Sequence, residues 1–75
     1  IIEKAVSENG VIRISYQDFQ GNVSIRDISP FEWTDFDQKK VRAYCYLRLE
    51  ERSFSILNIQ KAEYLGPTDE YKKNH

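Results

Sequence analysis

Arginine and tyrosine alternate within the stretch VRAYCYLR at residues 41–48. Successive side chains of a β-strand point to opposite faces, so the polar residues of this stretch would share one face. These residues are Arg42, Tyr44, Tyr46 and Arg48. Arginine holds phosphate oxygens with a planar fork, and tyrosine offers a flat ring on which nucleobases stack. The pattern indicates a surface for a phosphate-bearing ligand. An ordinary half-exposed strand face is the alternative, because both residue types are common there.

A second strand with an arginine follows this stretch. Residues 49–51 form a short polar break and residues 52–56 alternate again, which predicts a hairpin. The turn would bring Arg48 near Arg52, and two neighbouring guanidinium groups repel unless an anion lies between them or both reach water. Ion pairing is the alternative, with the carboxylates of Glu50, Glu51 or Asp27.

The opposite face of the same stretch is small and apolar, which suits a tightly curved sheet. It consists of Val41, Ala43, Cys45 and Leu47. Cys45 is the only cysteine, so it forms no internal disulfide and is predicted to be a buried hydrophobe. The only histidine, His75, ends the chain, so neither a cysteine nucleophile nor a zinc site is expected.

The preceding part of the chain reads as a helix followed by a hairpin. Residues 1–9 carry a narrow apolar stripe and predict a short helix that stops at Asn9-Gly10. Residues 11–17 alternate as a strand, and Gly21 is the predicted left-handed position of the turn that follows. In the next strand, residues 23–28, the apolar parity slips between Ile25 and Ile28. A bulge at Arg26-Asp27 would bring both isoleucines to the core and re-aim Arg26 towards a site.

The remaining segments complete a small barrel. Pro30 is expected to end regular pairing or to lie on an edge. Phe31, Trp33 and Phe36 are predicted to cover one mouth of the barrel as packing residues, and a ligand-stacking role is the alternative for Trp33. Residues 57–61 are expected to form a helical turn before a last strand at 62–65. Gly66-Pro67 would end the domain, so residues 1–67 are the predicted domain and residues 68–75 a disordered polar tail.

Composition sets the limits of function. Seventy-five residues with a net charge of −1 allow one small domain. The acidic pairs 50–51 and 69–70 are read as solvated charges, and no catalytic motif is present, so we expect neither an enzyme nor a cofactor. No stretch approaches the ~20 apolar residues that cross a bilayer, and no signal peptide leads the chain. We expect a cytoplasmic location without membrane contact. The absence of an initial methionine suggests a fragment of a larger chain.

The order of these motifs resembles a WYL domain. The residues concerned are A-Y-C-x-L-R at 43–48, R-x-F at 52–54, I-x-x-I at 56–59 and A-E at 62–63, preceded by R-x-I-x-P at 26–30. WYL domains are small SH3-like or Sm-like barrels of bacterial regulators and some helicases. The resemblance implies an all-β barrel of about five antiparallel strands with a short N-terminal helix.

The resemblance also implies a basic, aromatic-lined patch for nucleic acid or a nucleotide-like anion. Arg48 and Arg52 match the family's paired arginines around the hairpin turn. Arg26 and Tyr16 match an arginine of the second strand and a tyrosine of the first. The naming Trp-Tyr-Leu triplet falls on residues 39–41, and two usual arginines are Ser55 and Asn58. The lysines at 39 and 40 restore charge there, without bidentate geometry.

The sequence therefore predicts an accessory module of a larger bacterial helicase or transcription regulator. Its expected partners are single-stranded nucleic acid or a nucleotide-like anion and the rest of the host chain. The predicted site residues are Arg26, Arg48, Arg52, Tyr16, Tyr44, Arg42 and Lys40. The alternative is a structural module that docks a neighbouring domain or a second copy, with the arginines in ion pairs.

Overall fold

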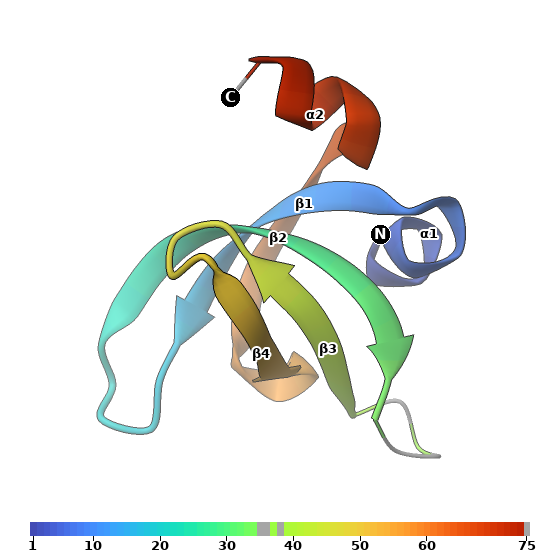
Figure 1. Cartoon of the computed structure of the whole chain (residues 1–75). Coiled ribbons are helices and arrows are strands. Elements are labelled where there is room, and N and C mark those ends of the chain that lie inside the picture. The colour runs from blue at the N-terminus through green and yellow to red at the C-terminus, as the bar shows by residue number, and fades with distance from the viewer. Residues whose placement is uncertain (35–36, 38, 75) are drawn as a thin grey trace.

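The computed structural model describes residues 1–34, 37 and 39–74. One antiparallel sheet of five strands, in the order β4-β3-β2-β1-β5, is flanked by a helix at each end of the chain (Figure 1). The elements are α1 (Ile2–Glu8), β1 (Gly10–Gln17), β2 (Val23–Trp33), β3 (Lys40–Cys45), β4 (Glu50–Ser55), the 3₁₀ turn η1 (Ile56–Asn58), β5 (Ile59–Pro67) and α2 (Thr68–Asn74). The prediction of a small all-β fold with five antiparallel strands and an N-terminal helix is confirmed.

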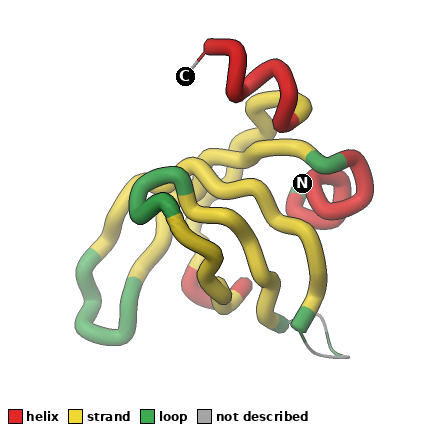
Figure 2. The backbone as a smooth tube through the Cα atoms, viewed as in Figure 1, coloured by secondary structure: helices red, strands yellow, loops and turns green. Residues whose placement is uncertain are grey.

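The sheet is strongly curved but is not a closed barrel, because β4 and β5 remain its two edges. The arch of β1 and β2 forms the convex side, with α2 above it, while the β3–β4 hairpin curls beneath it (Figures 1 and 2). Part of the bend comes from a register shift in β2 between Pro30 and Glu32. Pro30 lies beyond the part of β2 that pairs with β1, so its missing N–H removes no bond to that strand.

The core lies on the concave side of the sheet. Directly opposed residues of antiparallel strands share a face, and the register places the buried apolar residues of β1 to β4, apart from Val11, on this one. The fully buried side chains here include Ile12, Ile14, Ile28, Val41, Ala43, Cys45 and Phe54. The predicted apolar face of the central strand is therefore confirmed for Val41, Ala43 and Cys45.

Helix α1 covers one end of this core through Ala5, which is fully buried. The helix stops at Asn9, whose φ of 54° is left-handed, as the Asn9-Gly10 pair predicts. A Cβ on Gly10 would lie 2.6 Å from a ring carbon and from the hydroxyl oxygen of Tyr64, so close packing favours glycine at this position. A helix of this length is marginal alone and depends on these contacts.

The hairpin turn lies earlier than the sequence indicates. β3 ends at Cys45, which pairs with Glu50, and residues 46–49 make the turn, with Leu49 at a φ of 57°. The predicted break at residues 49–51 was wrong. Leu47 continues the apolar alternation of the strand in the sequence, but in the structure it lies in the turn and is 55% exposed. Tyr46 and Arg48 consequently leave the strand face on which the alternation placed them.

The predicted bulge at Arg26-Asp27 is absent. β1 and β2 pair without interruption from Ile12 opposite Ile28 to Gln17 opposite Val23. Ile28 is buried, as expected, but Ile25 points to the convex side and is 61% exposed. The parity slip has another cause, since the core-facing position between Ser24 and Ile28 is occupied by Arg26 rather than by an apolar residue.

Residues 68–74 of the segment that the sequence predicted to be disordered form helix α2, docked on the convex side, and residue 75 lies outside the described residues. The Thr68 hydroxyl donates to the Asn9 carbonyl at 2.6 Å and lies 3.1 Å from the Ser29 hydroxyl. The Tyr71 hydroxyl donates to Asp27 at 2.7 Å, and its ring lies 4.7 Å from that of Tyr46. The polar composition of this segment suggested a solvated tail. The prediction was wrong because the contacts that hold the helix are made with residues distant in sequence, which composition does not reveal.

We expect α2 docking to weaken at alkaline pH. Burial, and then the hydrogen bond to the Asp27 carboxylate, raise the pKa of Tyr71 to about 12, above the value of about 10 for an unfolded tyrosine. A pKa raised in the folded state gives stability that is complete below about pH 10 and is lost towards about pH 12. Melting temperatures at about pH 9 and about pH 11.5 should fall more in the native chain than in Tyr71→Phe. Burial also raises the pKa of Tyr46 in the native chain, and the variant keeps Tyr46, so some loss is expected in the variant too. An equal fall in both would contradict the assignment.

Burial of Cys45 gives a second expectation. Replacing Cys45 by alanine should lower the free energy of unfolding by roughly 1–2 kcal/mol, because the variant loses a buried sulfur and leaves a small cavity. Urea unfolding measures this change. The native thiol should react with an alkylating reagent only as fast as the chain opens, so immediate labelling would show that Cys45 is accessible.

Candidate anion-binding site on the concave side

Arg26 lies half-buried on the core-facing side of β2. Its Nε donates to the Ser24 hydroxyl at 3.0 Å, and its Nη1 lies 3.9 Å from the Cys45 sulfur. The centre of the guanidinium is 5.9 Å from the ring centroids of both Tyr16 and Phe54. The charge is thus held by ring faces and neutral groups, within the range of cation–π attraction.

Tyr16 and Phe54 form the aromatic support of this guanidinium. Their rings meet edge to face, with centroids 5.1 Å apart and planes at 88°. The Tyr16 hydroxyl accepts a hydrogen bond from the Ser55 backbone N–H at 3.3 Å. Tyr16 therefore joins β1 to the edge strand β4 across the concave side, and the sheet's curvature positions Arg26.

Arg26 has no carboxylate within ion-pair distance among the described residues. A half-buried charge without a counter-ion is unfavourable, and an anion from solution would relieve that cost. The Nε atom is already used by Ser24 and one Nη by a weak sulfur contact, so the outer N–H groups are left for such an anion.

Arg52 lies on the same side of the sheet, opposite Ala43 on the edge strand. Its Nη1 is 3.8 Å from a carboxylate oxygen of Glu50, which lies opposite Cys45 on this side as well. This contact is longer than a hydrogen bond. Arg52 therefore provides a second, loosely held positive charge on the same side of the sheet as Arg26.

The two sides of the sheet carry different charge balances. The strand positions on the convex side carry as many carboxylates as cations: Asp27, Glu32, Glu51 and Glu63 against Arg13, Lys40, Arg42 and Lys61. The core-facing strand positions carry Arg26 and Arg52 against Glu50 alone. The concave side thus has an excess positive charge that the convex side lacks.

The structure separates the predicted site residues instead of joining them in one patch. Tyr16, Arg26 and Arg52 share the concave side, whereas Arg42, Tyr44 and Lys40 project from the convex side, and Arg48 lies exposed in the hairpin turn. The expectation of one patch was wrong because residues of both sides were assigned to a single surface.

Arg42 is already neutralised on the convex side. Its guanidinium contacts Glu51 at 3.1 Å and Glu32 at 3.4 Å, and lies 5.6 Å from the Phe31 ring centroid. Tyr44 packs edge to face on Tyr46, with centroids 5.0 Å apart. The tyrosines take part in the packing of α2 against the convex side. The alternative of ion-paired arginines applies to Arg42, and in a weaker form to Arg52.

Sequence reasoning missed two members of the concave site. Ser24 holds Arg26, and Phe54 supports it as well as filling the core. Glu50 was named only as a possible ion-pair partner, and the register places it on the concave side, opposite Cys45. The available signal was the parity slip itself, since a polar residue at a core-facing strand position marks either a bulge or a site.

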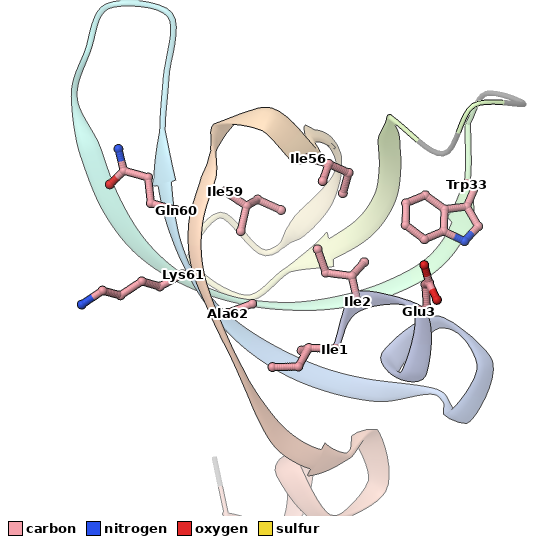
Figure 3. Close-up of a pocket in the computed structure, with 9 residues that line it drawn as sticks. All are labelled: Ile1, Ile2, Glu3, Trp33, Ile56, Ile59, Gln60, Lys61 and Ala62. Atoms are coloured by element: carbon pink, nitrogen blue, oxygen red, sulfur yellow. The ribbon is translucent and has the colours of Figure 1, made fainter.

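A separate apolar groove lies towards α1, with a volume of about 520 Å³. Ile2, Ile56, Ile59 and Trp33 face one another around it, while the side chain of Lys61 points away (Figure 3). No described helix has the length and apolar character needed to span a membrane. The described residues also contain no cluster of metal-ligating side chains.

Comparison with known proteins identifies the fold. No family model matches the chain, and no curated protein matches it. Among solved structures the chain is similar to proteasome accessory factor B/C (PafBC) of Arthrobacter aurescens, with a TM-score of 0.76 and 23% sequence identity. The match covers 95% of this chain and 12% of that chain. This likeness shows the fold and is consistent with the resemblance to WYL domains.

Proposed function

We propose that this chain is an accessory module of a larger bacterial DNA-acting protein, with a transcription regulator favoured over a helicase. It binds single-stranded nucleic acid or a nucleotide-like anion on the concave side of its sheet. The observation that carries the proposal is the half-buried guanidinium of Arg26, held over two rings with no described carboxylate beside it. The similarity to a small part of PafBC supports the regulator host.

Arg26 is the principal contact in this proposal. A phosphate reaches its outer N–H groups, Arg52 adds a second positive charge, and Tyr16 is the aromatic neighbour. Arg48, exposed in the turn two residues before Glu50, extends the positive surface for a longer chain. Phosphate contacts hold a strand in place without reading its sequence, so binding is weak, salt-sensitive and nearly indifferent to base identity.

The test compares Arg26→Gln with Arg42→Gln. Both remove one positive charge, but only Arg26 lies on the concave side. We expect Arg26→Gln to weaken binding of a fluorescent single-stranded oligonucleotide about tenfold or more at low salt, since it removes a charge-assisted bond to phosphate. The slope of log affinity against log salt should become shallower by about 0.7 for each phosphate that the variant no longer neutralises. Arg42→Gln should change affinity by less than about twofold, because its charge is already paired.

Fluorescence anisotropy across a salt series measures both quantities, and thermal melts confirm that each variant is folded. Equal affinity of native chain and Arg26→Gln would remove the basis of the proposal. A larger decrease of affinity in Arg42→Gln would move the site to the convex side.

The second candidate function is a structural module that docks a neighbouring domain or a second copy. It is favoured by the bidentate contact of Arg13 with Asp27, at 2.8 and 3.1 Å, and by the paired state of Arg42. In that case neither variant would bind differently from the native chain, and replacement of Arg13 or Arg42 would instead lower the melting temperature.

A further inference from the structure

We propose that Glu50 makes the concave site selective for a singly charged phosphodiester over a doubly charged phosphate monoester. The inference rests on the proposed function and deepens it, because it assigns the ligand to nucleic-acid strands rather than to free nucleotides. Among the core-facing strand positions in the described chain, Glu50 is the only acidic residue.

The register places Glu50 on the same side of the sheet as both positive charges of the site. It lies opposite Cys45, whose sulfur is 3.9 Å from Arg26 Nη1, and opposed residues have Cβ atoms ~4.5–5.5 Å apart. Its carboxylate is also 3.8 Å from Arg52 Nη1. An anion that contacts the outer N–H groups of Arg26 therefore approaches the carboxylate of Glu50.

The contact between Glu50 and Arg52 is weak enough for a ligand to displace it. At 3.8 Å it is longer than the 2.8 Å contact of Arg13 with Asp27 and the 3.1 Å contact of Arg42 with Glu51. The Glu50 side chain is 58% exposed, so water screens the attraction. A ligand phosphate can take Arg52 from Glu50, but the negative charge of Glu50 stays beside the ligand.

Charge balance then distinguishes the two ligand classes. Arg26 and Arg52 with Glu50 leave one net positive charge, which a phosphodiester with a single negative charge neutralises. A phosphate monoester carries about −1.5 to −2 at pH 7, so it brings an excess negative charge towards Glu50. Without Glu50 the site would carry two positive charges and would suit the monoester better.

The experiment uses the smallest member of each class. Thymidylyl-(3′→5′)-thymidine carries one phosphodiester, and thymidine 5′-monophosphate carries a monoester on the 5′-oxygen of the same nucleoside. Backbone amide shifts of the ¹⁵N-labelled chain, followed by NMR during titration, give both dissociation constants and report whether residues around Arg26 respond. The variants are Glu50→Gln, Glu51→Gln and Arg26→Gln.

We expect the native chain to bind the dinucleotide more tightly than the monophosphate. Glu50→Gln should strengthen monophosphate binding about three- to tenfold and dinucleotide binding by less, since repulsion grows with ligand charge. Glu51→Gln is the matched control: it removes the same charge one residue away, on the convex side, and should leave the ratio unchanged.

Equal strengthening of both ligands, or none, in Glu50→Gln would overturn the inference, and so would an equal change of the ratio in Glu51→Gln. If Arg26→Gln still abolished binding, the proposed function would stand without a selective role for Glu50. Failure of the native chain to bind either ligand or a longer oligonucleotide would overturn both.

Discussion

The concave site depends on one contact, the Arg26 guanidinium held against the rings of Tyr16 and Phe54. The three residues come from β2, β1 and β4, and β1 and β4 are not neighbours in the sheet. They meet only because the sheet curls until the Tyr16 hydroxyl reaches the backbone N–H of Ser55. Curvature, which the core requires, is therefore also what assembles the site.

The open edges of this sheet are compatible with a folded, separate domain. Exposed strand edges invite pairing with other chains, and charged residues along an edge oppose it. The edge strand β4 exposes Glu50, Glu51 and Arg52, and the other edge, β5, exposes Lys61 and Glu63. Two of the charged residues that oppose pairing along the β4 edge, Glu50 and Arg52, thus also contribute to the charge of the concave side. The hairpin β3–β4 is in this way both an edge and a part of the site.

The sequence predicted the elements well where a local rule decided them. Asn9 ends α1, Gly21 adopts a φ of 89° in the first turn, and Val41, Ala43 and Cys45 share a buried face. It failed where distant partners decide. Helix α2 depends on the contacts of Thr68 with Asn9 and of Tyr71 with Asp27. No local sequence pattern predicts such pairs. The hairpin turn was displaced because Leu47 kept the apolar parity while lying outside the strand.

The site could be predicted only in part for the same reason. Arg26 and Arg52 were recognised as site residues, but the expected bulge at Arg26 does not exist, and Arg42 and Tyr44 lie on the other side of the sheet. Which arginine has no described carboxylate beside it depends on the register, because Arg42 meets Glu32 and Glu51 only across three adjacent strands.

The concave side combines an apolar region and a charged region, and the alternation of residues along one strand does not predict where one gives way to the other. Towards α1 it is apolar, with Ile12, Ile28 and Val41 fully buried, and this half supplies the stability of a small domain. Towards the β1–β2 turn the same strand β2 continues with Arg26 in place of an apolar residue. A hydrophobe there would extend the core, whereas a guanidinium adds a desolvation cost that packing alone does not require. The two rings reduce that cost, but no described carboxylate offsets the charge. In β2 the apolar core therefore stops two core-facing positions short of the turn, and these positions hold Arg26, which can hold a charged ligand, and its partner Ser24.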